Sequence, residues 1–112
     1  MDRMQGVNTT AVHAGYEPEG DFGAVAPPIY QTATFAYESA EQGARRFAGE
    51  EDGYIYTRYA NPTLAVFEQR IAALEGTEAG LGMASGMAAI STVLLGLLNA
   101  GDHVVATDSL YT

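Results

Sequence analysis

One face of a predicted helix stands out in the middle of the chain. Apolar residues recur there every three or four positions, at Leu64, Phe67, Ile71 and Leu74. Asn61 can cap the first turn, Pro62 suits the first helical position, and Gly76 can end the helix. The pattern predicts a helix between Pro62 and Gly76 whose apolar face belongs to the core.

A second pattern begins at Ala79. Ala79–Ala84 is predicted as a strand, Ala88–Leu98 as a buried helix, and His103–Thr107 as a second strand parallel to the first. This β-α-β unit is typical of an α/β fold. In the turn before the helix, Ser85 can cap and Gly86 leaves the first N–H groups open to an anion, although such a turn is usually only a cap.

The first third of the chain has a less regular pattern. Thr9–His13 could form a short turn of helix, and residues 15–23 are rich in turn formers. Two adjacent prolines, followed by β-branched and aromatic residues, predict that residues 26–35 run extended as an arm. Its apolar side chains need a covering surface, which a partner subunit or the chain's own domain could supply equally well.

A short polar helix is predicted after the arm. Ala40–Ala48 has good helix propensity, with Ser39 and Gln42 placed as a capping box and a glycine at the end. Arg45 and Arg46 lie in its middle. We interpret them as solvated arginines on a surface helix.

The segment Tyr54–Tyr59 carries the second candidate for anion binding. If it is extended, alternation places Tyr56 and Arg58 on one face, where a phenol and a guanidinium could bind a phosphate together. The simpler alternative is an exposed strand edge with a solvated arginine. We place a boundary near Ala60, between an N-terminal arm at residues 1–60 and the start of an α/β domain at residues 61–112.

The charge of the chain is strongly one-sided. It has 14 acidic residues against five arginines and no lysine, giving a formal net charge of −9. Such a chain is expected to bind neither nucleic acid nor anionic membranes. Cysteine is absent and the two histidines are isolated, so no metal site is expected. With no signal-peptide pattern and no apolar run of the ~20 residues that span a bilayer, we expect a soluble, cytoplasmic chain.

Eight short motifs together resemble a known family. They are His13-Ala-Gly15, Pro27-Pro-Ile-Tyr-Gln-Thr32, Tyr56-Thr-Arg58, Asn61-Pro-Thr63, Leu74-Glu-Gly76, Ala84-Ser-Gly-Met87, Gly101-Asp-His103 and Leu110-Tyr111. Their order resembles the N-terminal part of the Cys/Met-metabolism family of pyridoxal-phosphate (PLP) enzymes, over nearly all of the chain from about Asn8. The resemblance implies the first part of a fold-type I transferase, in which an extended and helical arm precedes the first β-α-β of the large PLP-binding domain.

The resemblance also implies roles for single residues. The cofactor phosphate would be held by the turn formed by Ser85, Gly86 and Met87, and by Tyr56 and Arg58 reaching across from the neighbouring subunit. Tyr111 would stack on the pyridine ring and act as a catalytic residue in proton transfer or leaving-group departure.

The implied activity is that of a lyase or transferase of sulfur amino-acid metabolism, by γ-elimination or γ-replacement on a small amino-acid substrate. The runs His13–Tyr16, Tyr30–Phe35 and Phe47–Glu50 look most like methionine γ-lyase, with O-acylhomoserine sulfhydrylases and cystathionine γ-synthase or γ-lyase as alternatives. The family implies a homotetramer built as a dimer of dimers.

Family members form a Schiff base through a lysine, which this sequence lacks. We therefore expect an N-terminal fragment that is inactive alone. A non-catalytic chain that docks on a full-length homologue, and an anion-binding α/β module unrelated to PLP, are the hypotheses from other classes.

Overall fold

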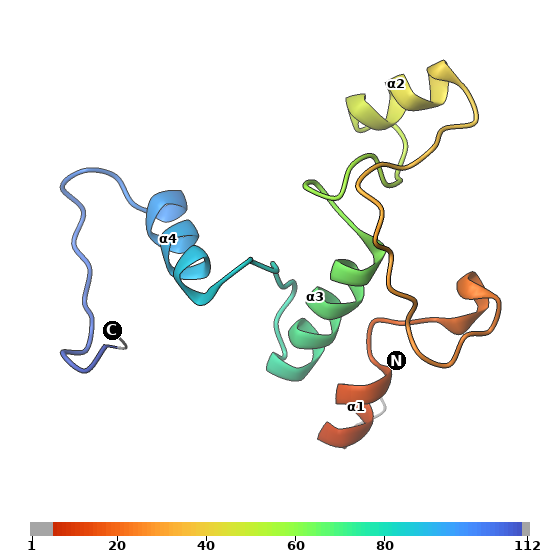
Figure 1. The fold of residues 1–112 in the computed structure, drawn as a ribbon. Helices are drawn as coiled ribbons and strands as arrows, with labels where there is room; N and C mark the ends of the chain where they lie inside the picture. The colour runs from red at the N-terminus through yellow and green to blue at the C-terminus, as the bar shows by residue number, and fades with distance from the viewer. Residues whose placement is uncertain (1–5, 111–112) are drawn as a thin grey trace. The chain divides into compact units, whose positions relative to one another are not determined.

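The computed structural model describes residues 6–110 and contains four α-helices and one 3₁₀ helix in that range. They are α1 (Val7–His13), η1 (Pro18–Asp21), α2 (Ala40–Ala48), α3 (Pro62–Glu75) and α4 (Gly86–Leu97) (Figure 1). The chain divides into two compact units, one ending at Gly82 and the other beginning at Met83. The boundary predicted near Ala60 concerns domains and subunit contacts, and it stays a prediction.

The ends of α3 and α4 confirm the predicted caps. The side-chain oxygen of Asn61 accepts a hydrogen bond from the Thr63 N–H at 2.9 Å, and Gly76 ends α3 with a left-handed φ of 67°. Ser85 Oγ accepts from the Ala88 N–H at 3.1 Å. The caps satisfy N–H groups that have no partner inside the helix.

The cap of α2 is as predicted on one side only. Ser39 Oγ accepts from the Gln42 N–H at 3.2 Å, and Gly49 ends the helix in the left-handed region. In a capping box the side chain of Gln42 would bind the N–H of Ser39 itself. Instead, its Oε1 accepts from the Glu38 N–H at 2.8 Å, so the cap reaches one residue further back along the chain.

The two strands predicted around α4 are not paired in the structure. Ala79–Ala84 and His103–Thr107 run as coil, and residues 6–110 contain no strand beyond an isolated antiparallel bridge between Thr34 and Tyr56. A strand is stabilised by hydrogen bonds to a neighbouring strand. Neither segment pairs with such a neighbour among the residues that the structure describes.

The predicted core face of α3 is exposed. Leu64, Phe67, Ile71 and Leu74 have exposed fractions between 37% and 53%, whereas Ala72 is 6% exposed. The reason is the direction from which α1 packs (Figure 1). Gly15, just after α1, lies against Val66 and Gln69, on a different side of the helix from that apolar face.

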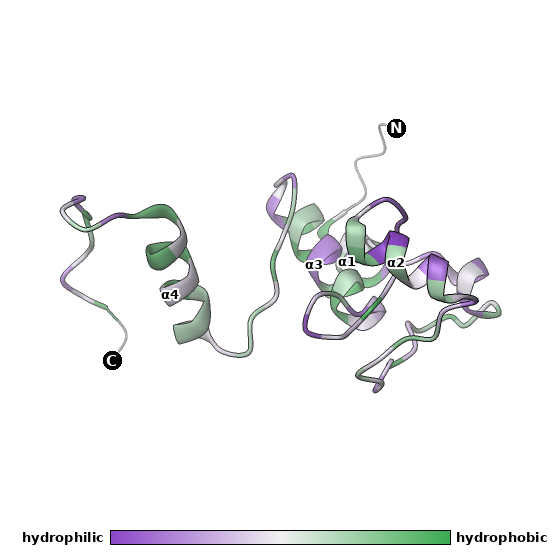
Figure 2. Cartoon of the chain, turned by 90° about the horizontal axis from the view of Figure 1, so that it is seen from above, coloured by the Kyte–Doolittle hydropathy of each residue, from purple (hydrophilic) through white to green (hydrophobic). Residues whose placement is uncertain are grey.

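The second unit also exposes apolar side chains. The ribbon of α4 is coloured green or white along its length, while purple hydrophilic positions mark α2 (Figure 2). Leu95 is 84% exposed and Leu97 is 76% exposed, so the prediction that this helix is buried is wrong for the structure described. None of the described helices is long and apolar enough to cross a membrane.

Candidate functional site

The segment that carries Tyr56 is held beside the arm. The Phe35 N–H donates to the Ile55 carbonyl at 3.3 Å, and the Thr57 N–H donates to the Ala33 carbonyl at 2.9 Å. Together with the bridge between Thr34 and Tyr56, these bonds bring the arm and the segment together as a short antiparallel contact. The backbone of the arm is thus held by its own chain, whereas Ile29 on the same arm is 75% exposed, so the surface that covers its apolar side chains stays a prediction.

Arg58 lies in a turn, not in an extended run. The N–H groups of Tyr59 and Ala60 both donate to the Tyr56 carbonyl, at 2.8 and 3.2 Å. The alternation that would have placed Tyr56 and Arg58 on one face therefore stops at Thr57. The turn nonetheless brings the two residues together, because Cζ of Arg58 lies 5.0 Å from the ring centroid of Tyr56 and 5.5 Å from that of Tyr59.

Asn61 fixes this turn to the arm. Only 3% of it is exposed, and its side-chain nitrogen donates to the Tyr30 carbonyl and to Thr57 Oγ1, both at 3.0 Å. Thr57 Oγ1 in turn donates to the Thr32 carbonyl at 2.5 Å. The sequence identified Asn61 only as a helix cap. Its second role depends on the bond to Tyr30, 31 positions away, which no local pattern reveals.

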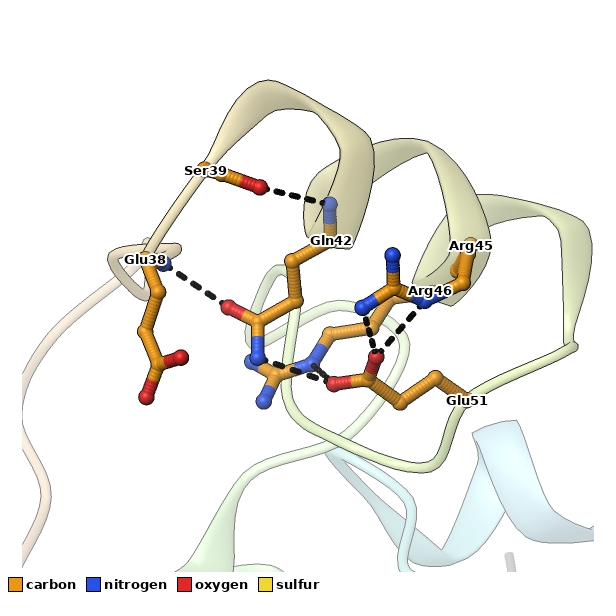
Figure 3. A network of polar contacts seen from close by, with 6 residues as sticks. All are labelled: Glu38, Ser39, Gln42, Arg45, Arg46 and Glu51. Carbon is orange, nitrogen blue, oxygen red and sulfur yellow. Dashed lines mark hydrogen bonds and ion pairs between the residues drawn. The ribbon is translucent and has the colours of Figure 1, made fainter.

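Two of the described arginines pair with Glu51, and only Arg45, whose side chain is 48% exposed, is solvated as predicted. The Nε and Nη2 atoms of Arg45 donate to the same Glu51 oxygen at 3.0 and 2.7 Å, and Arg46 Nε lies 3.3 Å from the other oxygen (Figure 3). The Arg46 side chain is only 19% exposed. Hydrogen bonds from Arg45 and Gln42, with the nearby positive charges, lower the pKa of Glu51 below its ordinary value.

Arg58 differs from these arginines. Arg70 Nε donates to the Ala14 carbonyl at 2.9 Å, whereas Arg58, among residues 6–110, has neither a hydrogen bond nor an ion pair. Its guanidinium group lies against aromatic rings, and these rings do not neutralise its positive charge. A shallow cavity of about 480 Å³ lies beside it, lined by residues 30–33 and 56–58.

The predicted phosphate turn has the expected geometry within its own unit. Ser85 satisfies the N–H groups of Ala88 and Ala89, through its side chain and its carbonyl respectively. The N–H groups of Gly86 and Met87 have no acceptor among the described residues. Space is open at the turn, since a Cβ added to Gly86 would meet nothing within 4 Å.

Tyr111, the predicted catalytic and ring-stacking residue, lies outside the described residues. Within residues 6–110, no group of three or more acidic or histidine side chains is placed to hold a metal ion.

Comparison with known proteins decides the family. The family described as Cys/Met metabolism PLP-dependent enzyme matches residues 8–112. The chain belongs to this family. The resemblance inferred from the order of the motifs is therefore confirmed.

The curated relatives are much longer than this chain. L-methionine γ-lyase of Fusobacterium nucleatum subsp. nucleatum is 58% identical over 109 residues, which cover 97% of this chain and 27% of that enzyme. O-succinylhomoserine sulfhydrylase of Pseudomonas aeruginosa is 43% identical over 106 residues, covering 93% of this chain and 26% of that enzyme. The chain thus spans about a quarter of the length of these relatives.

A solved structure confirms the fold class. The chain superposes on a Campylobacter jejuni protein with a TM-score of 0.77 and 40% identity, over 86% of this chain and 24% of that one. That structure contains N′-pyridoxyl-lysine-5′-monophosphate. The chain is therefore the N-terminal part of the fold-type I architecture, and pyridoxal phosphate is the cofactor of its family.

The residues present fit the phosphate of this cofactor. Unpaired N–H groups at the start of a helix and an arginine without a carboxylate partner are both groups that bind phosphate in proteins. The chain offers the first at Gly86 and Met87 and the second at Arg58.

Proposed function

We propose that the complete protein containing this chain is a PLP-dependent carbon–sulfur lyase that eliminates the γ-substituent of methionine. The observation that carries this proposal is the 58% identity to a methionine γ-lyase over 97% of the chain. The bound cofactor would supply an electron sink for removal of the α- and β-protons of the substrate. The Schiff-base lysine would lie outside these 112 residues, which contain none.

The residues of this chain would bind and orient the cofactor. The N–H groups of Gly86 and Met87, at the turn capped by Ser85, would donate to the phosphate and benefit from the helix dipole. Tyr56 and Arg58 would complete the phosphate site from the neighbouring subunit of a homotetramer. Tyr111 would cover the pyridine ring and assist proton transfer. In this assembly residues 1–60 form the arm and residues 61–112 begin the large domain.

An O-acylhomoserine sulfhydrylase is the second candidate, and the 43% identity to the Pseudomonas aeruginosa enzyme favours it. Both candidates act on small amino acids in the cytoplasm. They differ in whether the γ-substituent is eliminated or replaced by sulfide. To separate them, this chain would replace the matching segment of each relative, giving two hybrid enzymes. We expect the hybrid with the Fusobacterium lyase to retain the larger fraction of its parent's kcat/KM, and the reverse ranking would favour the sulfhydrylase.

The phosphate site can be tested in the Fusobacterium hybrid. Loss of a charge-assisted hydrogen bond costs about 1.5–3 kcal/mol, so Arg58→Ala should weaken PLP binding roughly 10- to 150-fold. Pyridoxal, which lacks the phosphate, should bind equally well to both proteins. Arg45→Ala is the matched control, because Arg45 is paired with Glu51 and should leave both affinities unchanged. Equal weakening of PLP and pyridoxal by Arg58→Ala would contradict the phosphate role.

A further inference from the structure

Thr57 lies where the extended segment beside the arm ends and the turn that carries Arg58 begins. Its N–H donates to the Ala33 carbonyl at 2.9 Å, which ties the backbone of the segment to the arm. The backbone bonds that follow close the turn on the Tyr56 carbonyl. The conformation of Thr57 therefore sets the direction of the chain on both sides, toward Tyr56 and toward Arg58.

The side-chain hydroxyl of Thr57 adds a second tie. Its Oγ1 accepts from Asn61 Nδ2 at 3.0 Å and donates to the Thr32 carbonyl at 2.5 Å. Asn61 is only 3% exposed and also donates to the Tyr30 carbonyl, so its amide is already fixed on that side. A group placed between an amide N–H and a carbonyl must both accept and donate. A hydroxyl does this, and an apolar side chain of the same shape does not.

The hydroxyl of Thr57 also joins two parts of the cavity beside Arg58. Residues 30–33 of the arm and residues 56–58 both line this cavity, and the bond from Thr57 to the Thr32 carbonyl connects them directly. Arg58 is exposed, and among the described residues its guanidinium makes no hydrogen bond or ion pair that could fix it. Its position therefore depends on the backbone that carries it.

We propose that Thr57 is a positioning residue for Tyr56 and Arg58: its hydroxyl holds the segment that carries both of them against the arm, so that the phenol and the guanidinium meet the cofactor phosphate together. This inference rests on the proposed function, in which Tyr56 and Arg58 bind that phosphate. Thr57 acts through its neighbours, because its own hydroxyl is already bonded to Asn61 and to the Thr32 carbonyl.

The test uses the Fusobacterium hybrid described above and two substitutions of Thr57. Thr57→Val keeps the branched shape but removes both hydrogen bonds, whereas Thr57→Ser keeps the hydroxyl. Thr57→Val is also combined with Arg58→Ala, because a double variant shows whether the two residues act together. Thr77→Val is the matched control, since the Thr77 hydroxyl also donates to a backbone carbonyl, that of Ala79, but beyond the end of α3. Binding of PLP and of pyridoxal is measured for each variant.

We expect Thr57→Val to weaken PLP binding roughly 3- to 10-fold, which matches the loss of one neutral hydrogen bond. Pyridoxal binding should be unchanged, Thr57→Ser should keep most of the PLP affinity, and Thr77→Val should have no effect. In the Arg58→Ala background, Thr57→Val should weaken PLP binding by a smaller factor, because the guanidinium that it positions is gone. If Thr57→Val fails to fold, the smaller Thr57→Ala carries the same expectation.

Three outcomes would overturn the inference. The first is an unchanged PLP affinity of Thr57→Val, or a Thr57→Ser variant as weak as Thr57→Val. The second is equal weakening of PLP and pyridoxal, which would give Thr57 a general structural role. The third is the same loss of PLP affinity with and without Arg58. Failure of the proposed function looks different, because the unsubstituted hybrid would then bind no PLP, or Arg58→Ala alone would leave PLP binding intact.

Discussion

Replacement of the buried Asn61 should loosen the turn that carries Arg58. Asn61→Ala removes three hydrogen bonds at once: the cap on the Thr63 N–H and the two donations to the Tyr30 carbonyl and Thr57 Oγ1. The side chain is 3% exposed, so water cannot simply replace the amide without some opening of the structure.

The magnitude follows from these contacts. Loss of an N-cap costs about 1 kcal/mol. Leaving the Tyr30 carbonyl without its donor adds about 1–2 kcal/mol, because buried polar groups lose more than an average hydrogen bond contributes. The local opening free energy should therefore fall by about 2–3 kcal/mol, which is a roughly 30- to 150-fold loss of protection from hydrogen exchange.

Amide hydrogen exchange in the hybrid enzyme measures this directly. The N–H of Thr63 donates to the Asn61 side chain and that of Tyr30 donates to Thr63 Oγ1, so both amides report on the site. Ser39→Ala is the control for a cap alone, since Ser39 is exposed and its side chain accepts only from Gln42. If Asn61→Ala costs no more protection at α3 than Ser39→Ala costs at α2, the two donated bonds contribute nothing and the reasoning is refuted.

Three further changes have defined outcomes. Because the pKa of Glu51 is lowered in the folded state, its ion pairs stabilise the fold above the ordinary carboxyl pKa and are lost as the pH falls through the folded pKa. An NMR titration of Glu51 should show that Arg45→Ala moves the titration midpoint to higher pH. An unmoved midpoint would count against the pairing. Gly80→Ala should free the Gly82 amide, which donates to Glu68 Oε1 at 2.7 Å, to exchange faster, because the new Cβ meets the Glu68 carbonyl, whereas unaltered exchange would show that the close approach is unnecessary. Ser85→Ala should destabilise α4 by about 1 kcal/mol, because Ser85 Oγ no longer accepts from the Ala88 N–H. The Ala88 amide should then exchange faster, while the capped amides of the other helices are unchanged.

The helices could be predicted because their signals are local. Asn61 and Pro62 start α3 and Gly76 ends it, while Ser85 starts α4, as the sequence indicated. Each cap depends on residues within one turn, where steric preference and a single hydrogen bond decide the conformation. The tie from Asn61 to Tyr30 spans 31 positions and has no local signature.

Burial and strand pairing could not be predicted in the same way. The apolar face of α3 and the β-type run at residues 103–107 indicate that these segments can pack against a helix or sheet and pair with a strand. The described residues do not provide those partners. A helix shows an apolar stripe whenever some surface covers it in the assembled protein. Leu64 and Phe67 are exposed here, so the core predicted from their spacing is not formed among the described residues.

The sequence alone does not show which arginine would bind an anionic cofactor, whereas the structure shows the partners of each described arginine. On a chain with a net charge of −9, any arginine could serve as the local positive charge for an anionic cofactor. Glu51 pairs with Arg45 and Arg46. Arg70 Nε donates to the Ala14 carbonyl, while its Nη2 is buried without a hydrogen-bond partner among the described residues. Arg58 packs against tyrosine rings and keeps its donors available, in a turn that Asn61 holds in place through Thr57. Arg58 thus differs from Arg45 and Arg46 in having no carboxylate partner among the described residues, and from Arg70 in being exposed.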